Sequence, residues 1–393
     1  MINISEKSRC CGCTCCAGVC PEECIHMHFC DEGFQYPKTD TEKCINCGLC
    51  EKVCPIINPQ LKIDRFEMPT AYAAIINDEP LRLESSSGGV FTLLAFHVIN
   101  KDGVVFGAAF SDDFQTVSHI AVESVDKLER LRGSKYVQSS IDSAYGQAKE
   151  YLDAGRMVLF TGTPCQIAGL YAYLGQDYDN LITQDVVCHG VPSPHIWAEY
   201  VKLREKKAKS KTRNVSFRHK KHGWKYFDMR FEFTNGTEYI KTVSEDMYMR
   251  GFLDNIYLRP SCYDCSFKSI PKHSDITLAD FWGIWDLIPE MFDDKGTSLV
   301  LLNSDKGKAL FEQIQSKLVF RHVDCMQAVQ FNSAATKSAD LPKCRDDFFK
   351  VFKEQGLNKA LNKYCRVKFI VKFKRKIRKL LSKTMKFIIG NKA

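Results

Sequence analysis

Two cysteine runs near the start of the chain constrain its fold more than any other feature. The second run consists of Cys44, Cys47, Cys50 and Cys54, spaced C-x2-C-x2-C-x3-C and followed by Pro55. The first run repeats that spacing with Cys10, Cys13, Cys16 and Cys20, followed by Pro21. Twelve of the 19 cysteines lie between Cys10 and Cys54, far more than packing alone requires. These thiols are therefore interpreted as ligands of metal centres.

The spacing is typical of bacterial ferredoxins, in which three thiolates of a run bind one [4Fe–4S] cluster and the fourth reaches the other cluster. We therefore predict one cluster ligated by Cys10, Cys13, Cys16 and Cys54, and a second ligated by Cys44, Cys47, Cys50 and Cys20. A pair of zinc sites is the alternative, which interleaved runs fit poorly because zinc takes four ligands in one compact site. The remaining thiols of the block are interpreted as small buried side chains beside the clusters: Cys11, Cys15, Cys24 and Cys30.

Composition is that of a folded chain of two or three domains, with 45% hydrophobic and 26% charged residues. No apolar stretch reaches the roughly 18 residues needed to span a bilayer, and no signal peptide is visible. We expect a cytoplasmic protein. Because disulfides are rare in that compartment, metal ligation is favoured over disulfide pairing for the cysteines.

After Pro59 and Pro69 the sequence pattern changes, and strand-like runs alternate with helix-like runs. Strands are expected at 71–76, 103–110, 157–160 and 181–187, and helices at 90–99, 143–152, 164–174 and 194–206. This alternation predicts α/β layering. Residues 215–241 alternate about the turn signal Asn235-Gly236, which predicts an antiparallel hairpin, and the strand-like runs ITLADFW and SLVLL follow. The predicted fold is an α+β ferredoxin-like cluster domain at 1–60, a larger α/β domain at 70–340, and a helical tail at 341–393.

A second cysteine set lies in the α/β region, in FTGTPCQIAG, DVVCHGVPSP and SCYDC. Cys165 and Cys188 follow predicted strands, at the sheet edge where ligands bind in α/β folds. We predict that they form a third [4Fe–4S] site with Cys262 and Cys265; a four-cysteine zinc site or unrelated buried cysteines are the alternatives. The motif-free cysteines are taken as structural: Cys325, Cys344 and Cys365.

The basic character of the chain belongs to its tail. Residues 366–393 contain 11 Lys or Arg and no acidic residue, and without them 44 basic residues face 47 acidic ones. We therefore expect no nucleic-acid partner. Apolar residues recur in the tail at helical spacing, which predicts a basic amphipathic helix on an anionic membrane surface, peripheral on the inner face. A terminal helix docked on its own core or on another subunit is the alternative.

Six further stretches carry a family resemblance: SSSGGVFTLLA, LRGSKYVQS, VLFTGTPCQIAGL, DVVCHGVPSP, SCYDC and DITLADFWG. Together with the tandem ferredoxin block they resemble the coenzyme F-420 hydrogenase/dehydrogenase beta-subunit family, over Cys10 to Trp282. The resemblance implies FAD and iron–sulfur clusters, and electron exchange between a deazaflavin, a flavin or a related acceptor and a partner's clusters. It also implies that Cys165, Cys188, Cys262 and Cys265 ligate the core cluster.

With that resemblance, two small-residue segments are candidate flavin sites. Ser86, Ser87, Gly88 and Gly89 precede a predicted helix, where backbone N–H groups attract phosphate; a plain helix cap is the alternative. Ser134 and Lys135 form the second segment, in which Lys135 would neutralise phosphate or stabilise a reduced flavin, or else is a solvated loop lysine. His189 is a candidate proton carrier, or a side chain that only hydrogen-bonds its loop.

Two further features each allow two interpretations. Asp280 either orients a ligand or caps a turn. The basic residues of FRHKKHGWKYF form either a basic lip for an anionic substrate or acidic partner, or an ordinary exposed hairpin: Arg218, Lys220, Lys221 and Lys225.

The sequence thus predicts an FAD- and iron–sulfur-dependent oxidoreductase. It would pass electrons between FAD and [4Fe–4S] clusters, coupling a deazaflavin-type or other two-electron substrate to a one-electron redox partner protein or small electron carrier. The alternatives are an electron-transfer subunit without its own substrate site, and a reductase in a membrane-associated biosynthetic pathway.

Overall fold

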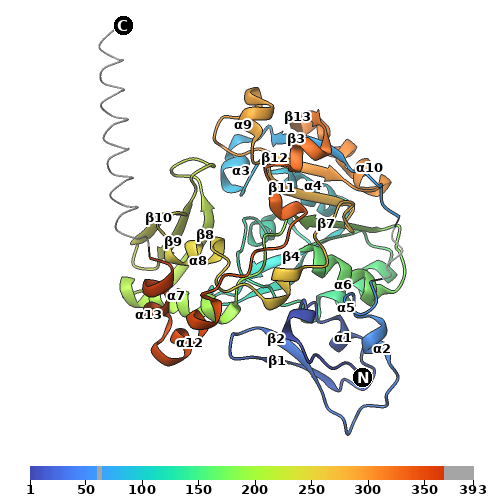
Figure 1. Cartoon of the computed structure of the whole chain (residues 1–393). Helices are drawn as coiled ribbons and strands as arrows, with labels where there is room; N and C mark the ends of the chain where they lie inside the picture. Colours follow the sequence, from blue (N-terminus) through green and yellow to red (C-terminus); the bar gives the residue numbers. More distant parts are fainter. Residues whose placement is uncertain (60–63, 367–393) are drawn as a thin grey trace.

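The computed structural model describes residues 1–59 and 64–366. Three parts are visible in Figure 1: a large sheet with helices, a small sheet beside it, and the N-terminal cysteine domain below helices α5 and α6. The basic helix expected in the tail lies outside the described residues. Among the described residues, no helix is long and apolar enough to cross a membrane.

The large sheet has eight strands, which lie in the order β13 (Leu318–Val323), β3 (Thr70–Ile76), β12 (Ser298–Leu302), β11 (Ile276–Asp280), β7 (Leu181–Val186), β6 (Val158–Gly162), β4 (Val104–Phe110) and β5 (Val117–Val122). The four strands β11, β7, β6 and β4 are parallel, and the others pair antiparallel. The mixed α/β class is confirmed. Parallel neighbours place the loops after β6 and β7 at one edge of the sheet.

Helices cover both faces of this sheet. Helices α4 (Val90–Ile99) and α10 (Asp305–Ile314) pack on one face, and α5 (Ala144–Asp153) and α6 (Pro164–Leu174) on the other. Side chains of a strand alternate between the faces: Val105 joins the α4 side, whereas Val104 and Phe106 join the α5–α6 side. Three short helices lie near the edge of the sheet that contains β3 (Figure 1): α3 (Glu79–Glu84), α9 (Ile284–Leu287) and α11 (Cys325–Val329).

The predicted hairpin is part of a three-stranded antiparallel sheet of β8 (Thr212–His219), β9 (Asp228–Phe233) and β10 (Glu238–Thr242). Its apolar side packs against Trp197 of α7 (Pro194–Ala208) and Tyr248 of α8 (Met247–Leu253). The same apolar cluster includes Phe348 and Leu361 of α12 (Arg345–Gln355) and α13 (Leu357–Tyr364). The described part of the expected tail therefore shares a core with the residues before 341.

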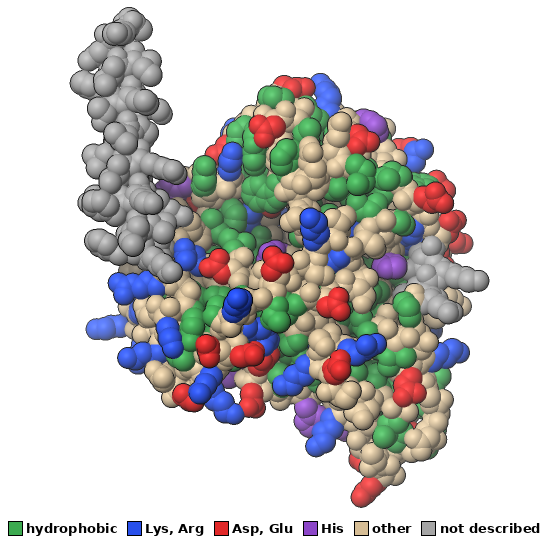
Figure 2. All heavy atoms as spheres, in the orientation of Figure 1, with side chains coloured by type: hydrophobic (Ala, Val, Ile, Leu, Met, Phe, Trp, Pro, Cys, Tyr) green, Lys and Arg blue, Asp and Glu red, His purple; other side chains and the backbone are tan. Residues whose placement is uncertain are grey.

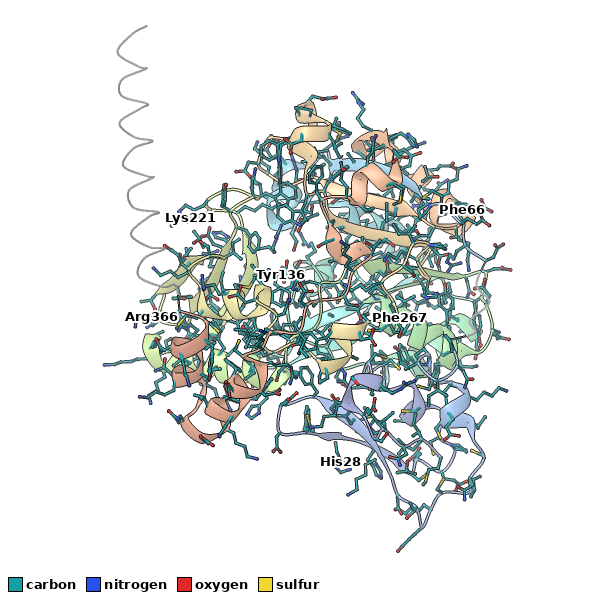
Figure 3. All side chains as sticks on the ribbon, viewed as in Figure 1. His28, Phe66, Tyr136, Lys221, Phe267 and Arg366 are labelled. Atoms are coloured by element: carbon teal, nitrogen blue, oxygen red, sulfur yellow. The ribbon has the colours of Figure 1, made fainter. Side chains whose placement is uncertain are left out.

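The N-terminal domain consists of a hairpin, β1 (Ile25–Phe29) and β2 (Gln35–Thr39), with two short helices, α1 (Cys15–Gly18) and α2 (Leu49–Lys52). Helix α1 contacts α5 and α6. Cys11, Cys13 and Cys15 belong to the apolar cluster on that face of the sheet, which also includes Phe267. Figure 3 places Phe267 beside the N-terminal domain, and His28 on the far side of its hairpin. The cysteine domain is thus packed onto the α/β core.

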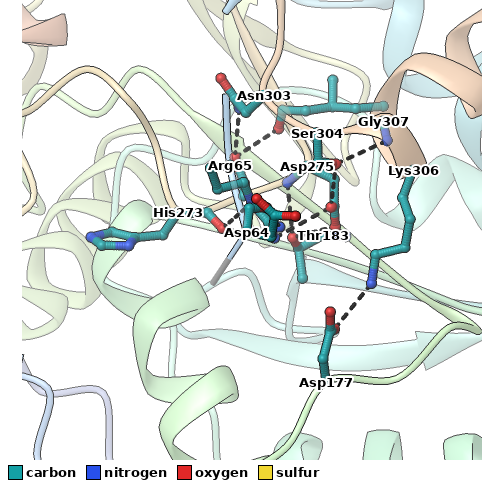
Figure 4. A network of polar contacts seen from close by, with 12 residues as sticks. Asp64, Arg65, Asp177, Thr183, His273, Asp275, Asn303, Ser304, Lys306 and Gly307 are labelled. Carbon is teal, nitrogen blue, oxygen red and sulfur yellow. Dashed lines mark hydrogen bonds and ion pairs between the residues drawn. The ribbon is translucent and has the colours of Figure 1, made fainter. Parts of the chain in front are cut away.

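A buried carboxylate anchors the connector that follows the cysteine domain (Figure 4). Asp275 accepts hydrogen bonds from the backbone N–H and hydroxyl of Thr183, at 2.7 and 2.8 Å, and from Ser304 at 2.6 Å. Arg65 of the connector completes the network with an ion pair to Asp275 at 3.3 Å. Both side chains are almost fully buried, so this pair fixes the connector against β7 and β11.

Candidate functional site

Four cysteines from three separate segments of the chain line one cavity of about 230 Å³. Cys165 is the second residue of α6, directly after β6, and Cys188 follows the end of β7. Cys262 and Cys265 come from the 3-10 helix Pro260–Asp264 and the residue after it. The sheet edge predicted from the sequence therefore brings Cys165 and Cys188 together with the Cys-x2-Cys pair.

Burial controls the acidity of these thiols. Burial, opposed by the charge of Lys268 and aided by the neighbouring thiols of Cys165 and Cys265, raises the pKa of Cys188 to about 12. Burial also raises the pKa of Cys262, and the charge of the neighbouring Cys188 thiol raises it as well. Thiols of this kind bind metal as thiolates, and the cavity is wider than a single ion between four sulfurs needs. The donor set and the space fit a polynuclear cluster.

Two lysines that sequence reasoning missed line the same cavity, Lys268 and Lys272. Lys268 donates to the carbonyl oxygens of Cys188 and Ala334, and Lys272 donates to the carbonyl oxygen of Ala335 at 2.6 Å. Their positive charges offset those of clustered thiolates. Both lysines follow the SCYDC motif within seven residues, but their contacts are with distant segments.

The N-terminal thiols gather in two crossed sets. A small cavity of about 20 Å³ is lined by Cys44, Cys47 and Cys50 of the second run together with Cys20 of the first. In the other set Cys16 lies near Cys10 and Cys54. Burial, and then the charges of those two thiols, raise the pKa of Cys16 to about 12. Each run thus contributes its fourth cysteine to the neighbourhood of the other; the ligand assignments stay a prediction. Among the described residues, no three His, Cys, Asp or Glu side chains converge as ligands of a single ion.

Two cysteines interpreted as bystanders lie directly beside these sets. Cys11 lines the core cavity, where its thiol lies between those of Cys13 and Cys165. Cys24 lines the cavity of the second run, with its sulfur 3.4 Å from that of Cys20. Cys15 is fully buried near Cys16 and Cys54, and Cys30 closes a turn with Gly33. Adjacency in the sequence gave no signal for the positions of Cys11 and Cys24.

The two candidate flavin segments are in contact. The backbone N–H and the hydroxyl of Ser134 both donate to the Ser86 hydroxyl, at 2.7 and 2.9 Å. Ser87 donates to the carbonyl of Thr297 at 2.8 Å, and the Gly88 N–H donates to Ser298 at 2.9 Å. An added Cβ at Gly88 would lie 2.3 Å from the Ala74 carbonyl oxygen, so only glycine fits there. A polar loop pair is therefore held against the sheet at the start of α4.

Lys135 closes its own loop. Its ammonium donates to the carbonyl oxygens of Leu131, Arg132 and Gly133, at 3.3, 3.0 and 3.2 Å, and burial lowers its pKa to about 7. Lys220 enters the other segment, where it donates to the carbonyl oxygens of Arg82, Ser87 and Lys295. Burial lowers its pKa to about 7 as well. The loops that could hold a phosphate-bearing cofactor therefore contain two desolvated amines.

The four basic residues of FRHKKHGWKYF form neither a basic lip nor an ordinary exposed hairpin. Arg218 is buried and paired with Asp280 at 2.8 Å, which itself accepts a hydrogen bond from Trp224. Lys220 lies among carbonyl oxygens, as described above, and Lys225 stacks over Trp285 at 3.6 Å. Lys221 alone of the four is exposed, at the tip labelled in Figure 3. The carboxylate of Asp280 explains the burial of Arg218, since a buried charge requires a partner.

His189 contacts its own surroundings through Asn255 and Phe252. Its Nε2 is 2.6 Å from Oδ1 of Asn255, and its ring meets the edge of Phe252 with centroids 5.1 Å apart. Burial lowers its pKa. These contacts are those of a side chain that organises its loop, and the proton-carrier role stays a prediction.

Acidic and basic side chains are interspersed over much of the face seen in Figure 2.

Two family models match parts of the chain. Residues 155–326 match the family model for the C-terminal part of the beta subunit of coenzyme F420 hydrogenase/dehydrogenase, and residues 37–56 match a 4Fe-4S binding domain. The first match contains all four core cysteines, and the second contains Cys44 to Cys54.

Two relatives illustrate the two parts. Ferredoxin 7Fe of Hydrogenibacillus schlegelii is 46% identical over 41 residues, which are 10% of this chain and 46% of that ferredoxin, so the chain spans about half of its length. A chain of the F420-reducing [NiFe] hydrogenase complex from Methanosarcina barkeri is similar with 15% identity and a TM-score of 0.47, over 75% of this chain and 91% of that one. The two matches identify residues 155–326 as similar to the C-terminal part of the coenzyme F420 hydrogenase/dehydrogenase beta subunit, and residues 37–56 as a 4Fe-4S binding domain.

Proposed function

We propose that this protein is an iron–sulfur flavoprotein oxidoreductase that couples a two-electron substrate, of deazaflavin type or another class, to a one-electron redox partner. The observation that carries the proposal is the core cavity of about 230 Å³, lined by Cys165, Cys188, Cys262 and Cys265 and bordered by Cys11 of the N-terminal block. A core metal site in contact with a ferredoxin-type domain is the arrangement that electron transfer through the chain requires.

The cluster assignments follow the crossed sets. In this proposal the domain at 1–60 is ferredoxin-like, with Cys10, Cys13, Cys16 and Cys54 on one [4Fe–4S] cluster, and Cys44, Cys47, Cys50 and Cys20 on the other. The domain at 70–340 holds the third cluster. The protein's part is to fix the distances between these sites and to set their potentials through charge, hydrogen bonds and burial.

An FAD site is proposed at the loop pair of Ser86, Ser87, Gly88, Gly89, Ser134 and Lys135. The support is the contact between Ser86 and Ser134 and the position of Gly89 at the N-terminus of α4, where backbone N–H groups and the helix dipole favour phosphate. Bound FAD would supply the exchange between two-electron and one-electron chemistry. Lys135 and Lys220 would supply positive charge beside it.

An electron-transfer subunit without a substrate site is the second candidate. This candidate is favoured by Lys135, because its ammonium already donates to three carbonyl oxygens of its own loop and so is not free to bind a flavin. In either case a redox partner protein or a small electron carrier would exchange electrons at the N-terminal domain.

Quantitation of iron, acid-labile sulfide, zinc and flavin on one anaerobic preparation of the full chain tests the proposal. Three cubanes predict about 12 Fe and 12 sulfide per chain, with one FAD. The same cluster content without flavin would select the electron-transfer subunit. Zinc in place of iron and sulfide would refute both.

A further inference from the structure

A fully buried arginine connects the N-terminal cysteine block to the loop of the core cysteines. Arg259 is 1% exposed and precedes Cys262 by three residues. Its Nε donates to the carbonyl oxygen of Cys10 at 2.7 Å, and its Nη2 lies 3.4 Å from the sulfur of Cys10. The guanidinium therefore touches a predicted cluster ligand through both backbone and sulfur.

The remaining donors of Arg259 are also satisfied without a carboxylate. Nη2 donates to the carbonyl oxygen of Gln35 at 2.9 Å, and Nη1 donates to the side chain of Gln138 at 3.0 Å. The guanidinium lies over the ring of Tyr36, 4.4 Å from its centroid. A buried cation is costly without a counter-charge. Burial lowers the pKa of Arg259, but the nearby ionisable groups together raise it above its ordinary value: the thiol of Cys10, the phenol of Tyr36, and the thiols of Cys11 and Cys262.

The cysteine loop is shaped around this side chain. Gly12, between Cys11 and Cys13, has φ +72°, and a Cβ there would lie 2.7 Å from Nη1 of Arg259. The backbone of the first run can approach the guanidinium this closely because it carries glycine at that position. The contact therefore depends on both residues, the guanidinium of Arg259 and the glycine at position 12.

We propose that Arg259 is a positioning residue that raises the reduction potential of the cluster ligated by Cys10 and holds that cluster beside the core site. The inference rests on the proposed cluster assignments. One-electron reduction adds a negative charge to the cluster, which a cation and an N–H donor at a ligand sulfur stabilise. Because Arg259 also lies near Cys262, its charge acts at the junction between the two sites.

Arg345 provides a matched control. It too is buried and ties the N-terminal domain to the rest of the chain, through a forked ion pair with Glu32 at 2.8 and 2.5 Å. Its partner is a carboxylate, so its loss would loosen the same contact between domains without removing a donor from a cysteine sulfur. A purely structural role of Arg259 would give both variants the same phenotype.

The experiment compares R259Q, R259K and R345Q in the full, cluster-loaded chain by EPR-monitored redox titration. R259Q is expected to lower the equilibrium constant for reducing one cluster about tenfold, about 59 mV for a one-electron couple. R259K should recover part of that loss, and R345Q should leave all potentials at wild-type values. Wild-type potentials in cluster-loaded R259Q, or an equal shift in R345Q, would overturn the inference.

A second measurement needs no stable R259Q. In wild-type protein with ¹⁵N-labelled arginine guanidinium groups, pulsed EPR of the reduced cluster should detect a ¹⁵N coupling, which R259K should abolish. Absence of that coupling in wild type would also overturn the inference. A wild-type chain that binds no iron–sulfur cluster would instead refute the proposed function, so the two failures are distinguishable.

Discussion

The thiols of Cys11 and Cys165 are neighbours, although 154 positions separate them in the chain and they belong to different domains. Both line the core cavity, and Cys11 also contacts Cys13 of the first run. Under the proposed assignments, the N-terminal and core clusters would therefore have ligands separated by a single intervening thiol.

The contact gives a prediction for Cys11. C11A is expected to retain the full iron content of about 12 per chain, because Cys11 stands between ligand sets and belongs to neither. C13A is expected to lose one cluster, about four Fe. Iron and sulfide analysis of both variants checks the pair. Loss of iron in C11A would place Cys11 among the ligands.

The core site is tested with a matched pair of buried cysteines. C188S should lower the iron content from about 12 to about eight per chain, since one thiolate of the core set is removed. C325S should leave iron unchanged, because Cys325 is buried in a separate apolar cluster without other thiols. Equal iron in wild type and C188S would contradict the core assignment.

The ion pair between Arg345 and Glu32 should contribute strongly to stability. Both side chains are largely buried, and removing one partner leaves an uncompensated charge, at a cost of about 3 kcal/mol. R345Q should therefore lower the free energy of unfolding, measured by anaerobic urea titration with tryptophan fluorescence. Lys353 and Asp31 form an exposed pair across the same interface, and K353Q should leave the unfolding midpoint unchanged.

Acid should destabilise the fold through His119. The ring is buried against Phe160, with Nε2 2.9 Å from the Thr161 carbonyl oxygen, and burial lowers its pKa to about 4. An unfolded histidine takes up its proton near pH 6.5, so stability is lost as the pH falls from about 6.5 to about 4, by roughly 3 kcal/mol. The free energy of unfolding, measured across this pH range, should fall less steeply with falling pH in H119Q than in wild type. H28Q, which alters an exposed histidine, should follow the wild-type curve.

Flavin binding is tested at the two desolvated lysines. K220M removes the ammonium that binds the Ser87 carbonyl oxygen, so the loop loses both its anchor and its positive charge. The FAD-to-protein ratio after reconstitution should fall by more than half, and K135M should act in the same direction. K221M changes the adjacent, exposed lysine and should leave the ratio unchanged. Equal flavin in K220M and K221M would remove the loop pair as the site.

Local signals predicted much of the fold. The apolar runs of β3, α4 and α6 were placed within a residue of their observed bounds, because each is long, periodic and flanked by Gly or Pro. Strands β5 and β13 were not predicted. Each has an exposed or half-buried side and pairs antiparallel at an edge of the sheet, so its pattern differs little from that of a loop.

The candidate site was predictable only in part. Regular spacing indicated the crossed cysteine sets, and strand ends indicated Cys165 and Cys188. Arg259, Lys268 and the buried pair of Arg218 with Asp280 were missed, because an isolated Arg or Lys in a sequence is usually a solvated side chain. Their roles depend on contacts between segments more than 50 residues apart, which spacing does not encode.

The anchoring of the cysteine domain bears on how a partner would reach it. Arg65, in the connector that follows the domain, is paired with Asp275, and Arg345 is paired with Glu32 in the domain's hairpin. These two contacts hold the domain in one position, so that under the proposed function its clusters would not move toward a donor. A one-electron partner would have to come to the outer thiols, where Cys47 is exposed, and electrons would then move inward over distances that the fold holds constant.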